Sequence, residues 1–510
     1  MATNYSPSTV TNGLQLCLDA ANPYSYPGTL EVLVVAGGGG GGTNMGGGGG
    51  GGGVISNTSY PVTAGTSISV TVGAGGNGAP AGTGEGHPTV PGTNGGNSVF
   101  GSLTAIGGGR GGISYNTRSY PEASGAAGGS GGGATGYNND NVAPGTITGG
   151  SATAGQGNRG GNQGNMYYSG GGGGAGSPGA DGNSQANGGD GVLNNILGTN
   201  YYWGGGGGGS AYSLSTGGNG GLGGGGGGAI GTTTGGAGYN NGQPGGGGAP
   251  YSWANTPGGD AGANTGGGGG GGSHYNATNK GGDGGTGIVI VRYKGSQAAT
   301  GGTVTSSNGY TIHTFTTSGT FTPALWGDLS RNWNNGTLVN GPTFNSSNGG
   351  NLEFDGTDDV VNVVGNFGTY ANYTICYWAL RAAENRMPVA GRLSAAFYWY
   401  GDNSWYYTHG GVSGEYYYSK NVSIPLNTWG HLCVVYNGAN VSIYRQGIYQ
   451  GQQSTSGTAD WSQGLKIGYW APGGGYAWLG KIASLQFYNT ALSATEITQN
   501  FNAQKSRFGL

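Results

Sequence analysis

The chain has 510 residues, a net charge of −3 at pH 7, only 7% charged residues and 130 glycines. This length allows two or three domains, and a near-neutral charge without a basic stripe argues against a nucleic-acid partner. The sequence has no run of about 20 apolar residues, and its first ten residues lack the basic start and apolar core of a secretory signal. We therefore expect assembly inside the cell and no membrane insertion.

The first predicted element is a strand. Residues 13–20 (GLQLCLDA) alternate apolar and polar positions, and Asn22 and Pro23 then indicate a turn. Cys17 lies in this strand, and Cys376 and Cys433 lie in two later apolar runs. An odd number of cysteines in apolar runs predicts reduced thiols in the core rather than a disulfide framework.

Glycine dominates the region from Glu31 to Tyr293. Its uninterrupted runs are Gly37–Gly42, Gly46–Gly53, Gly170–Gly174, Gly204–Gly209, Gly223–Gly228, Gly245–Gly248 and Gly266–Gly272. Runs without side chains can be ordered only by backbone hydrogen bonds between closely approaching segments. Helices of the polyproline II type make no internal hydrogen bonds, so packed polyglycine rods are predicted to satisfy one another.

A flexible glycine linker is the alternative for this region. Three features favour a folded domain. The β-type runs 31–36 and 287–293 enclose the region, charge is scarce, and the segments between the runs contain aromatic residues such as Tyr201 and Trp253.

Further strands are predicted on both sides of residue 325. Residues 66–72 and 98–106 are expected to pair as a hairpin beside the enclosing strands, and residues 309–322 to form a hairpin around Ser318 and Gly319. After Leu325, short β-type runs recur with turns between them, which is typical of an all-β sandwich. The exception is residues 493–503, where a capping box begins a helix.

The residues after 325 resemble the laminin G-like, concanavalin A-type lectin sandwich. The resemblance is carried by residues 354–359 (FDGTDD), 427–438 and 481–493. In that family, a segment like residues 13–27 runs directly into one like residues 325–342. The resemblance therefore implies an all-β fold in which residues 1–29 begin the sandwich, residues 30–322 form an inserted polyglycine II domain flanked by short strands, and residues 323–510 complete the sandwich.

The inserted region resembles the glycine-rich domains of bacteriophage tail-fibre adhesins. Residues 31–38, 104–112 and 285–293 match the recurring pattern. In many relatives, a stretch like residues 310–315 (YTIHTF) precedes the first enclosing strand, whereas here it follows the last one, so its pairing partner is open. Some such adhesins recognise host receptors through loops at the tip of the rod stack.

Catalytic and metal-binding patterns are weak in this sequence. Glu353, Asp355 and Asp358 echo the acidic strand of sandwich glucanases, but the third position is Asp, and the acidic residues also fit a self-bonded turn. The five histidines show no ligand spacing. We expect no enzyme activity, no catalytic residues and no cofactor, with Ca²⁺ at the Asp-rich turn as a weaker alternative.

Aromatic residues are the stronger candidates for binding. In the sandwich, alternation along a strand puts neighbouring rings on opposite faces, so one face must meet solvent or a partner. Sugar binding and subunit packing are equally open there. The candidates for carbohydrate or subunit contact are Tyr398, Tyr400, Trp405 and Tyr406.

In the glycine region, aromatic residues lie in the segments that join the rods. A rigid scaffold with aromatic, Asn-rich loops is typical of a receptor-binding surface, although the same rings could cap the slab instead. The receptor-binding candidates are Tyr115, Tyr120, Tyr137, Tyr167, Tyr168, Tyr201, Tyr202, Trp203, Tyr251 and Trp253.

Together these features predict a non-enzymatic tail-fibre or adhesin subunit of a phage virion. It would be assembled in the host cytoplasm, and it would bind a host receptor or glycan and other virion proteins. A homo-oligomer is expected, with a trimer as the first choice. The alternatives are a decoration protein that binds only virion proteins and a carbohydrate-active enzyme.

Overall fold

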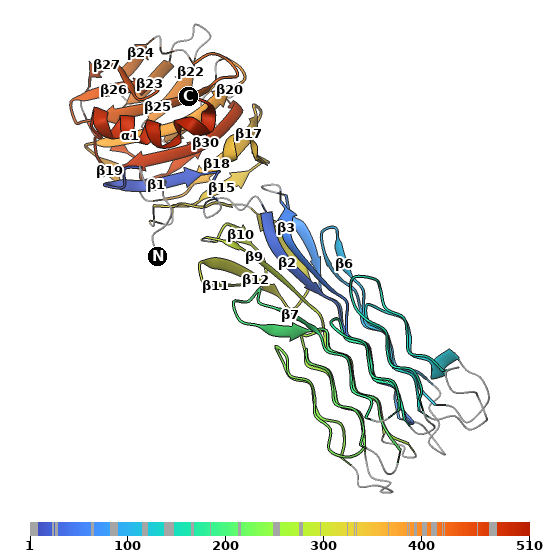
Figure 1. Ribbon diagram of the computed structural model, residues 1–510. Coiled ribbons are helices and arrows are strands. Elements are labelled where there is room, and N and C mark those ends of the chain that lie inside the picture. Colours follow the sequence, from blue (N-terminus) through green and yellow to red (C-terminus); the bar gives the residue numbers. More distant parts are fainter. Residues whose placement is uncertain are drawn as a thin grey trace.

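The computed structural model describes residues 9–510 except 23–24, 26–28, 63–65, 82–89, 115–120, 137–146, 165–167, 184, 213–215, 248–255, 275–278, 296, 324, 331, 333, 366, 385, 387, 392–394, 400–404, 410–415, 421, 423, 456 and 469–476. It contains a β-sandwich and an elongated glycine-rich slab that extends away from it (Figure 1). Strands predominate, and the predicted all-β sandwich is confirmed.

The sandwich has two large antiparallel sheets around one hydrophobic core. The first has the order β16-β17-β30-β20-β25-β26-β27, and β1 also pairs with β30. Its strands are β1 (Leu14–Asp19), β16 (Thr343–Asn345), β17 (Asn351–Asp355), β20 (Tyr373–Arg381), β25 (Trp429–Tyr436), β26 (Asn440–Arg445), β27 (Ile448–Ser454) and β30 (Leu479–Tyr488).

The second sheet of the sandwich has the order β14-β15-β18-β29-β21-β22-β23-β24. Its strands are β14 (Leu325–Trp326), β15 (Gly336–Val339), β18 (Val360–Val363), β21 (Val389–Gly391), β22 (Ala395–Trp399), β23 (Trp405–His409), β24 (Tyr416–Lys420) and β29 (Leu465–Ile467). A short pair, β19 (Thr369–Tyr370) and β28 (Ala459–Asp460), and the 3₁₀ turn η2 (Ser347–Gly349) complete the unit.

The described residues contain one α-helix, α1 (Ala494–Gln504), which lies across the outside of the first sheet and continues into η3 (Lys505–Phe508) (Figure 1). The predicted capping box is confirmed, because Ser493 accepts a bond from the Glu496 amide and the Glu496 carboxylate accepts one from the Ser493 amide. With 11 residues it is too short to cross a membrane, and no helix of the described residues is long and apolar enough to do so.

The chain leaves the sandwich after β1 and returns to it at β14. The two crossing segments are bonded to each other, since the Gly327 amide donates to the Ser25 carbonyl (2.6 Å) and the Cys17 amide donates to the Asp328 carboxylate (2.9 Å). Leu16 and Leu18 of β1 are fully buried in the sandwich core. The slab is thus attached by two adjacent chain segments rather than by one.

The end of the slab nearest the sandwich is built from two five-stranded sheets that share a core. One has the order β11-β12-β9-β2-β3 and the other β10-β13-β4-β5-β6. Their bounds are β2 (Thr29–Val35), β3 (Val54–Pro61), β4 (Ile68–Thr71), β5 (Ser98–Phe100), β6 (Leu103–Ala105), β9 (Ile288–Lys294), β10 (Ala299–Thr300), β11 (Thr303–Ser307), β12 (Tyr310–Phe315) and β13 (Gly319–Pro323).

The enclosing strands β2 and β9 pair directly, and Glu31 and Arg292 face each other in an ion pair of 2.7 Å. The open question about residues 310–315 is answered, because β12 pairs with β9 and with β11. The predicted hairpin over 309–322 is wrong: β12 and β13 belong to different sheets, and β13 pairs with β4 and β10. Alternation correctly identified both strands but does not specify which sheet a strand joins.

Residues 66–72 and 98–106 do pair, through β4 and β5, but they lie in the sheet opposite to β2 and β9. The segment 98–106 is itself a hairpin of β5 and β6. The third small sheet, β7 (Val192–Asn194) with β8 (Tyr201–Trp203), packs against the other face of the β2–β9 sheet. The 3₁₀ turn η1 (Pro121–Ala123) lies further along the slab.

The rest of the slab consists of extended glycine rods bonded through their backbones. In the rod Gly37–Gly42, each amide donates to a different neighbouring segment from the amide before it, and the sequence of neighbours repeats every three residues. The accepting carbonyls lie in residues 93–96, 282–285 and 47–50. Its carbonyls accept, with the same period, from residues 108–111, 76–79 and 269–272. Each central rod therefore has six neighbours, which confirms the predicted polyglycine II packing.

Glycine is required in these rods by contact rather than by flexibility. A Cβ on Gly49 would lie 2.1 Å from the Gly39 carbonyl oxygen, and a Cβ on Gly41 would lie 2.0 Å from that of Gly270. No side chain fits between rods that are this close.

The outer rods follow a different rule. With three residues per turn, two glycines face the interior and every third residue faces outward, as in Asn187-Gly-Gly-Asp190. The outward side chains accept bonds from the next rod: Asn187 Oδ1 accepts from the Asn219 amide (2.8 Å), and Asn219 Oδ1 accepts from the Thr234 amide (2.9 Å). At the surface of the slab, side-chain oxygens of Asn and Asp therefore accept the backbone hydrogen bonds that a further glycine rod would otherwise accept, so the stack of rods can end there.

Candidate binding surfaces

The far end of the slab is closed by a network of small polar side chains. Thr43, Asn44 and Met45 join the two central rods and are almost fully buried. The Met45 carbonyl accepts bonds from Thr135 Oγ1 (2.9 Å), from Ser169 Oγ (2.7 Å) and from the Gly136 amide (3.0 Å). The rod ends on this side are thus held in one bonded layer.

Most of the predicted receptor contacts adjoin this layer in sequence. Ser114 and Gly136 are each adjacent to an undescribed segment, and Ser169 and Ser273 each lie two residues from one. Ser114, Gly136 and Ser169 contact Asn44 or Met45. Of the predicted contacts, Tyr115, Tyr120, Tyr137, Tyr167, Tyr251 and Trp253 lie outside the described residues. Tyr168 is half-buried and forms an isolated antiparallel bridge with Ala211.

Tyr201, Tyr202 and Trp203 form β8, near the strand end of the slab rather than at its far end. Trp203 is fully buried in a core with residues of β2 and β9. Its prediction as a receptor contact needs correction, because its ring fills the gap between β8 and the sheet and has no exposed face. Tyr201 and Tyr202 remain half-exposed.

The sequence analysis missed Tyr239, which completes this aromatic cluster. Its ring stacks on Trp203 with centroids 5.6 Å apart and meets Tyr201 edge-on at 5.5 Å. Tyr239 is 37% exposed, and Leu193 on the neighbouring β7 is 49% exposed. The sequence did contain a signal for this role: Tyr239 interrupts the pattern of two glycines followed by one outward-facing residue that is typical of the outer rods.

In the sandwich, Tyr398 lies on β22, and Trp405 and Tyr406 lie on β23, where Tyr398 is opposite Tyr406. Tyr400 lies outside the described residues, and the exposure of the other three side chains is not described. Tyr407, the residue after Tyr406 on β23, is buried in the sandwich core, where burial raises the pKa of its phenol well above the usual value.

The acidic residues near β17 are held in a self-bonded turn. The Asp355 amide donates to Asp359 Oδ2 (2.8 Å), and the Thr357 amide donates to Asp355 Oδ1 (2.8 Å). Asp355, Asp358 and Asp359 bring carboxylate oxygens within 4.8 Å of one another. The pKa of Asp359 is raised, mainly by burial of the carboxyl group. The bond from the Asp355 amide lowers this pKa, and the charges of Asp355 and Asp358 raise it.

Glu353, the other candidate acid, forms an ion pair with Lys481 (2.7 Å) and accepts a bond from Asn345 Nδ2 (2.7 Å). Whether the Asp-rich turn binds Ca²⁺ remains an expectation from the sequence.

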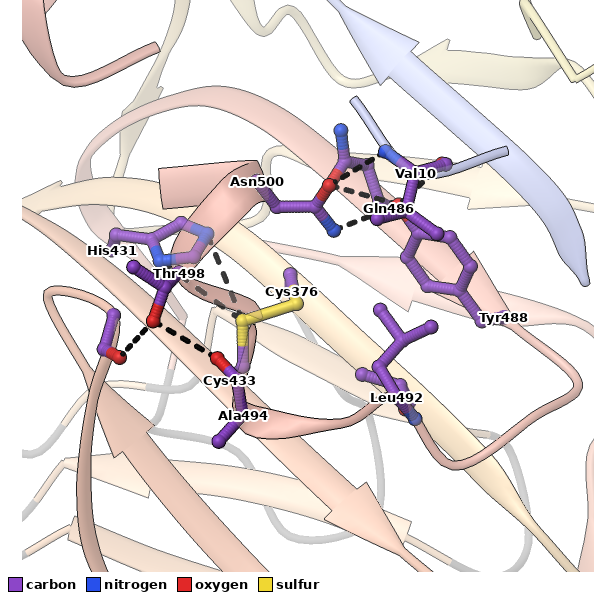
Figure 2. The surroundings of a disulfide bond; sticks show 12 residues. Val10, Cys376, His431, Cys433, Gln486, Tyr488, Leu492, Ala494, Thr498 and Asn500 are labelled. Atoms are coloured by element: carbon purple, nitrogen blue, oxygen red, sulfur yellow. Dashed lines mark hydrogen bonds between the residues drawn. A yellow bond between two sulfur atoms is a disulfide. The ribbon is translucent and has the colours of Figure 1, made fainter. Parts of the chain in front are cut away.

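The cysteines differ from the prediction. Cys376 and Cys433 form a disulfide between the adjacent strands β20 and β25, where they are directly opposite each other with Cα atoms 4.1 Å apart (Figure 2). Cys17 is the free cysteine, and burial raises the pKa of its thiol well above the usual value. The pairing was missed because the two residues are 57 apart in sequence and only the strand register brings them together.

Residues 21–294, more than half of the chain, match the profile of the family described as a glycine-rich domain. The chain belongs to this glycine-rich domain family. Residues 298–498 match the profile of the concanavalin A-like lectin/glucanases superfamily. Residues 299–323 at the start of that match form β10 to β13, whose strand partners lie in the slab sheets.

The solved structures that match this chain do so over about a third of its length. Domain 4 of the extracellular arabinanase AbnA from Geobacillus stearothermophilus is 16% identical over 35% of this chain and 92% of its own, with a TM-score of 0.30. The binding domain of Paraclostridial Mosquitocidal Protein 1 is 13% identical over 35% of this chain and 49% of its own, with a TM-score of 0.30. A botulinum neurotoxin type C structure is 12% identical over 35% of this chain and 48% of its own, with a TM-score of 0.29. These values are too low to support a functional argument. No curated protein is similar enough to count as a match.

Proposed function

We propose that this protein is a non-enzymatic structural component of a phage virion, a tail-fibre or adhesin subunit that attaches to a receptor or glycan on the host surface. The main support is the rod stack, in which backbone bonds make a stiff slab that ends in one bonded layer next to the aromatic loop sequences. Stiff supports reduce the entropy lost when a loop binds its target.

The double connection to the sandwich supports the same proposal. The bonds from Gly327 to Ser25 and from Cys17 to Asp328 join the two chain crossings at the base of the slab. The lectin-like sandwich would serve as the base, through which copies of the chain assemble with one another, as a trimer, and with other virion proteins. Several copies on one particle would then raise weak contacts to firm attachment through avidity.

The test is competition between the purified chain and intact particles for adsorption to host cells. Wild-type protein should block adsorption, and the double variant Tyr251→Ala with Trp253→Ala should block it at least about 30-fold less well, the loss expected for hot-spot residues worth about 2 kcal/mol. Leu193→Ala, on the exposed flank at β7, is the matched control and should behave as wild type.

Two results would contradict the proposal. One is a wild-type chain that does not compete although antibody labelling places it on the particle, which would favour a decoration protein. The other is cleavage of a host glycan that is lost in Glu353→Gln, which would favour the enzyme alternative.

A further inference from the structure

The face of the first sandwich sheet beneath α1 contains a cluster of three residues that the proposed function does not use. Cys376 on β20 lies opposite Cys433 on β25, and His431 is two residues before Cys433 and therefore shares its face. All three are buried, with exposures of 1% or less. Figure 2 shows the imidazole directed at the disulfide beside the Thr498 turn of α1.

His431 is unusual because its ring has no oxygen partner among the described residues. Its nitrogens approach only the Cys433 sulfur, at 3.7 Å for Nε2 and 4.0 Å for Nδ1. The ring packs against both Trp378 and Phe501, with centroids 5.1 and 5.7 Å away. A fully buried polar side chain normally has a stronger partner than one sulfur, since leaving it poorly bonded costs about 1–3 kcal/mol.

The geometry matches that of a thiophilic metal site. Zinc–sulfur and zinc–nitrogen bonds of about 2.3 and 2.0 Å in a tetrahedron place neighbouring S and N ligands about 3.5 Å apart. The separation of Cys433 Sγ from His431 Nε2 is 3.7 Å, and one ligand atom from each of the three residues lies within 4.8 Å of the others. Reduction would let the two sulfurs separate to a similar distance.

Charge balance favours a divalent ion at this place. Two thiolates and a neutral imidazole around a divalent cation carry no net charge, whereas a monovalent ion would leave a buried negative charge. The neutral imidazole is the form of histidine that coordinates metals. The other nearby thiol, Cys17, is separated from Cys376 by Gln486 of β30 and lies outside the cluster.

We propose that the reduced protein binds one thiophilic divalent ion of the zinc type through Cys376, Cys433 and His431, and that the disulfide is the alternative state of the same sulfurs. The chain is synthesised with both cysteines as thiols. Metal binding breaks two S–H bonds, releases two protons and forms two metal–sulfur bonds. In the metal-free chain, a disulfide-bearing oxidant accepts two electrons and both protons as the Cys376–Cys433 bond forms.

The test uses the full chain, produced in cobalt-supplemented medium and purified without oxygen in the presence of a phosphine reductant. Co²⁺ reports its ligands directly, because thiolate coordination gives a charge-transfer band and tetrahedral geometry gives strong visible bands. The reduced wild type should hold one Co²⁺ per chain, and the oxidised wild type should hold less than a tenth of that amount. Zn²⁺ should displace the cobalt and abolish the bands.

Variants assign the ligands. Cys433→Ser should lose the charge-transfer band, His431→Gln should weaken binding at least tenfold, and Cys17→Ser is the matched control that should bind as wild type. Near-ultraviolet circular dichroism checks that each protein is folded. The proposal is overturned if the reduced wild type, folded or unfolded, holds no Co²⁺, or if its band survives Cys433→Ser or disappears in Cys17→Ser. These outcomes do not depend on the adsorption test, since they require no receptor.

Discussion

The packing of the rods predicts a steep dependence of stability on position for replacements of glycine by alanine. At Gly49, in the centre of the slab, the new Cβ would meet the Gly39 carbonyl oxygen at 2.1 Å, so the rods must separate by about 1 Å to reach a tolerable contact. That movement breaks at least the two bonds that join these rods, Gly39 to Gly50 (2.9 Å) and Gly42 to Gly47 (2.9 Å).

Each buried backbone group that loses its partner costs about 1–3 kcal/mol, so two broken bonds cost about 2–6 kcal/mol. The smaller conformational freedom of alanine in the unfolded chain returns about 0.4–1 kcal/mol. We therefore expect Gly49→Ala to destabilise the slab by about 2–5 kcal/mol. Gly247 is the matched control, because the nearest atom to its added Cβ is 3.5 Å away, and Gly247→Ala should change stability by less than about 1 kcal/mol.

Hydrogen exchange followed by mass spectrometry measures this difference within the slab itself. In the wild type, amides of residues 37–53 should exchange slowly, and Gly49→Ala should accelerate their exchange by at least about 30-fold, as expected for a loss of 2 kcal/mol. Gly247→Ala should leave them slow. Equal exchange rates in the two variants would refute the packed-rod explanation, as would fast exchange in the wild type.

Two further predictions concern single side chains. The pKa of His431 is about 3 in the folded chain and 6.5 when unfolded, so the unfolded state binds the proton first and stability falls as the pH drops from 6.5 towards 3. Between pH 8 and pH 5 this group should remove about 2 kcal/mol in urea unfolding of the oxidised protein, and an equally steep pH dependence in His431→Gln would contradict the assignment. Asn219→Ala should cost about 1–2 kcal/mol and speed exchange at the Thr234 amide, which loses its acceptor, whereas Asn219→Asp should retain the bond.

The glycine runs were the most predictable part of the fold. A pure run has one kind of interaction available, so the polyglycine II arrangement of residues 37–42 and 46–53 followed from composition alone. The outer rods had an equally clear signal that was missed. Segments such as Asn94-Gly-Gly-Asn97 and Lys280-Gly-Gly-Asp283 repeat a polar residue every third position, which is the period of the rod itself.

The parts that could not be predicted depend on register or on three-dimensional neighbours. Alternation located β12 and β13, yet whether they join one sheet or two depends on the core between the sheets, which contains Phe315 and Phe321. The Cys376–Cys433 pair depends on the alignment of β20 with β25. Trp203 has the composition of a binding residue, and only the contact with the β2–β9 sheet shows that it is buried.

The strands also explain how featureless rods obtain a defined register. A glycine rod can slide along its neighbours by whole turns of three residues without a change in its contacts, so backbone bonds alone do not fix its height. In this chain the two central rods are direct continuations of strands, because residues 37–42 follow β2 and residues 46–53 precede β3. The outer rod at residues 281–287 likewise leads into β9. Side-chain packing and the Glu31–Arg292 ion pair set the register of β2 and β9, and the rods inherit it. A slab of this kind therefore requires a side-chain-bearing sheet at one end, which leaves the opposite end as the place where its connecting segments can vary without disturbing the lattice.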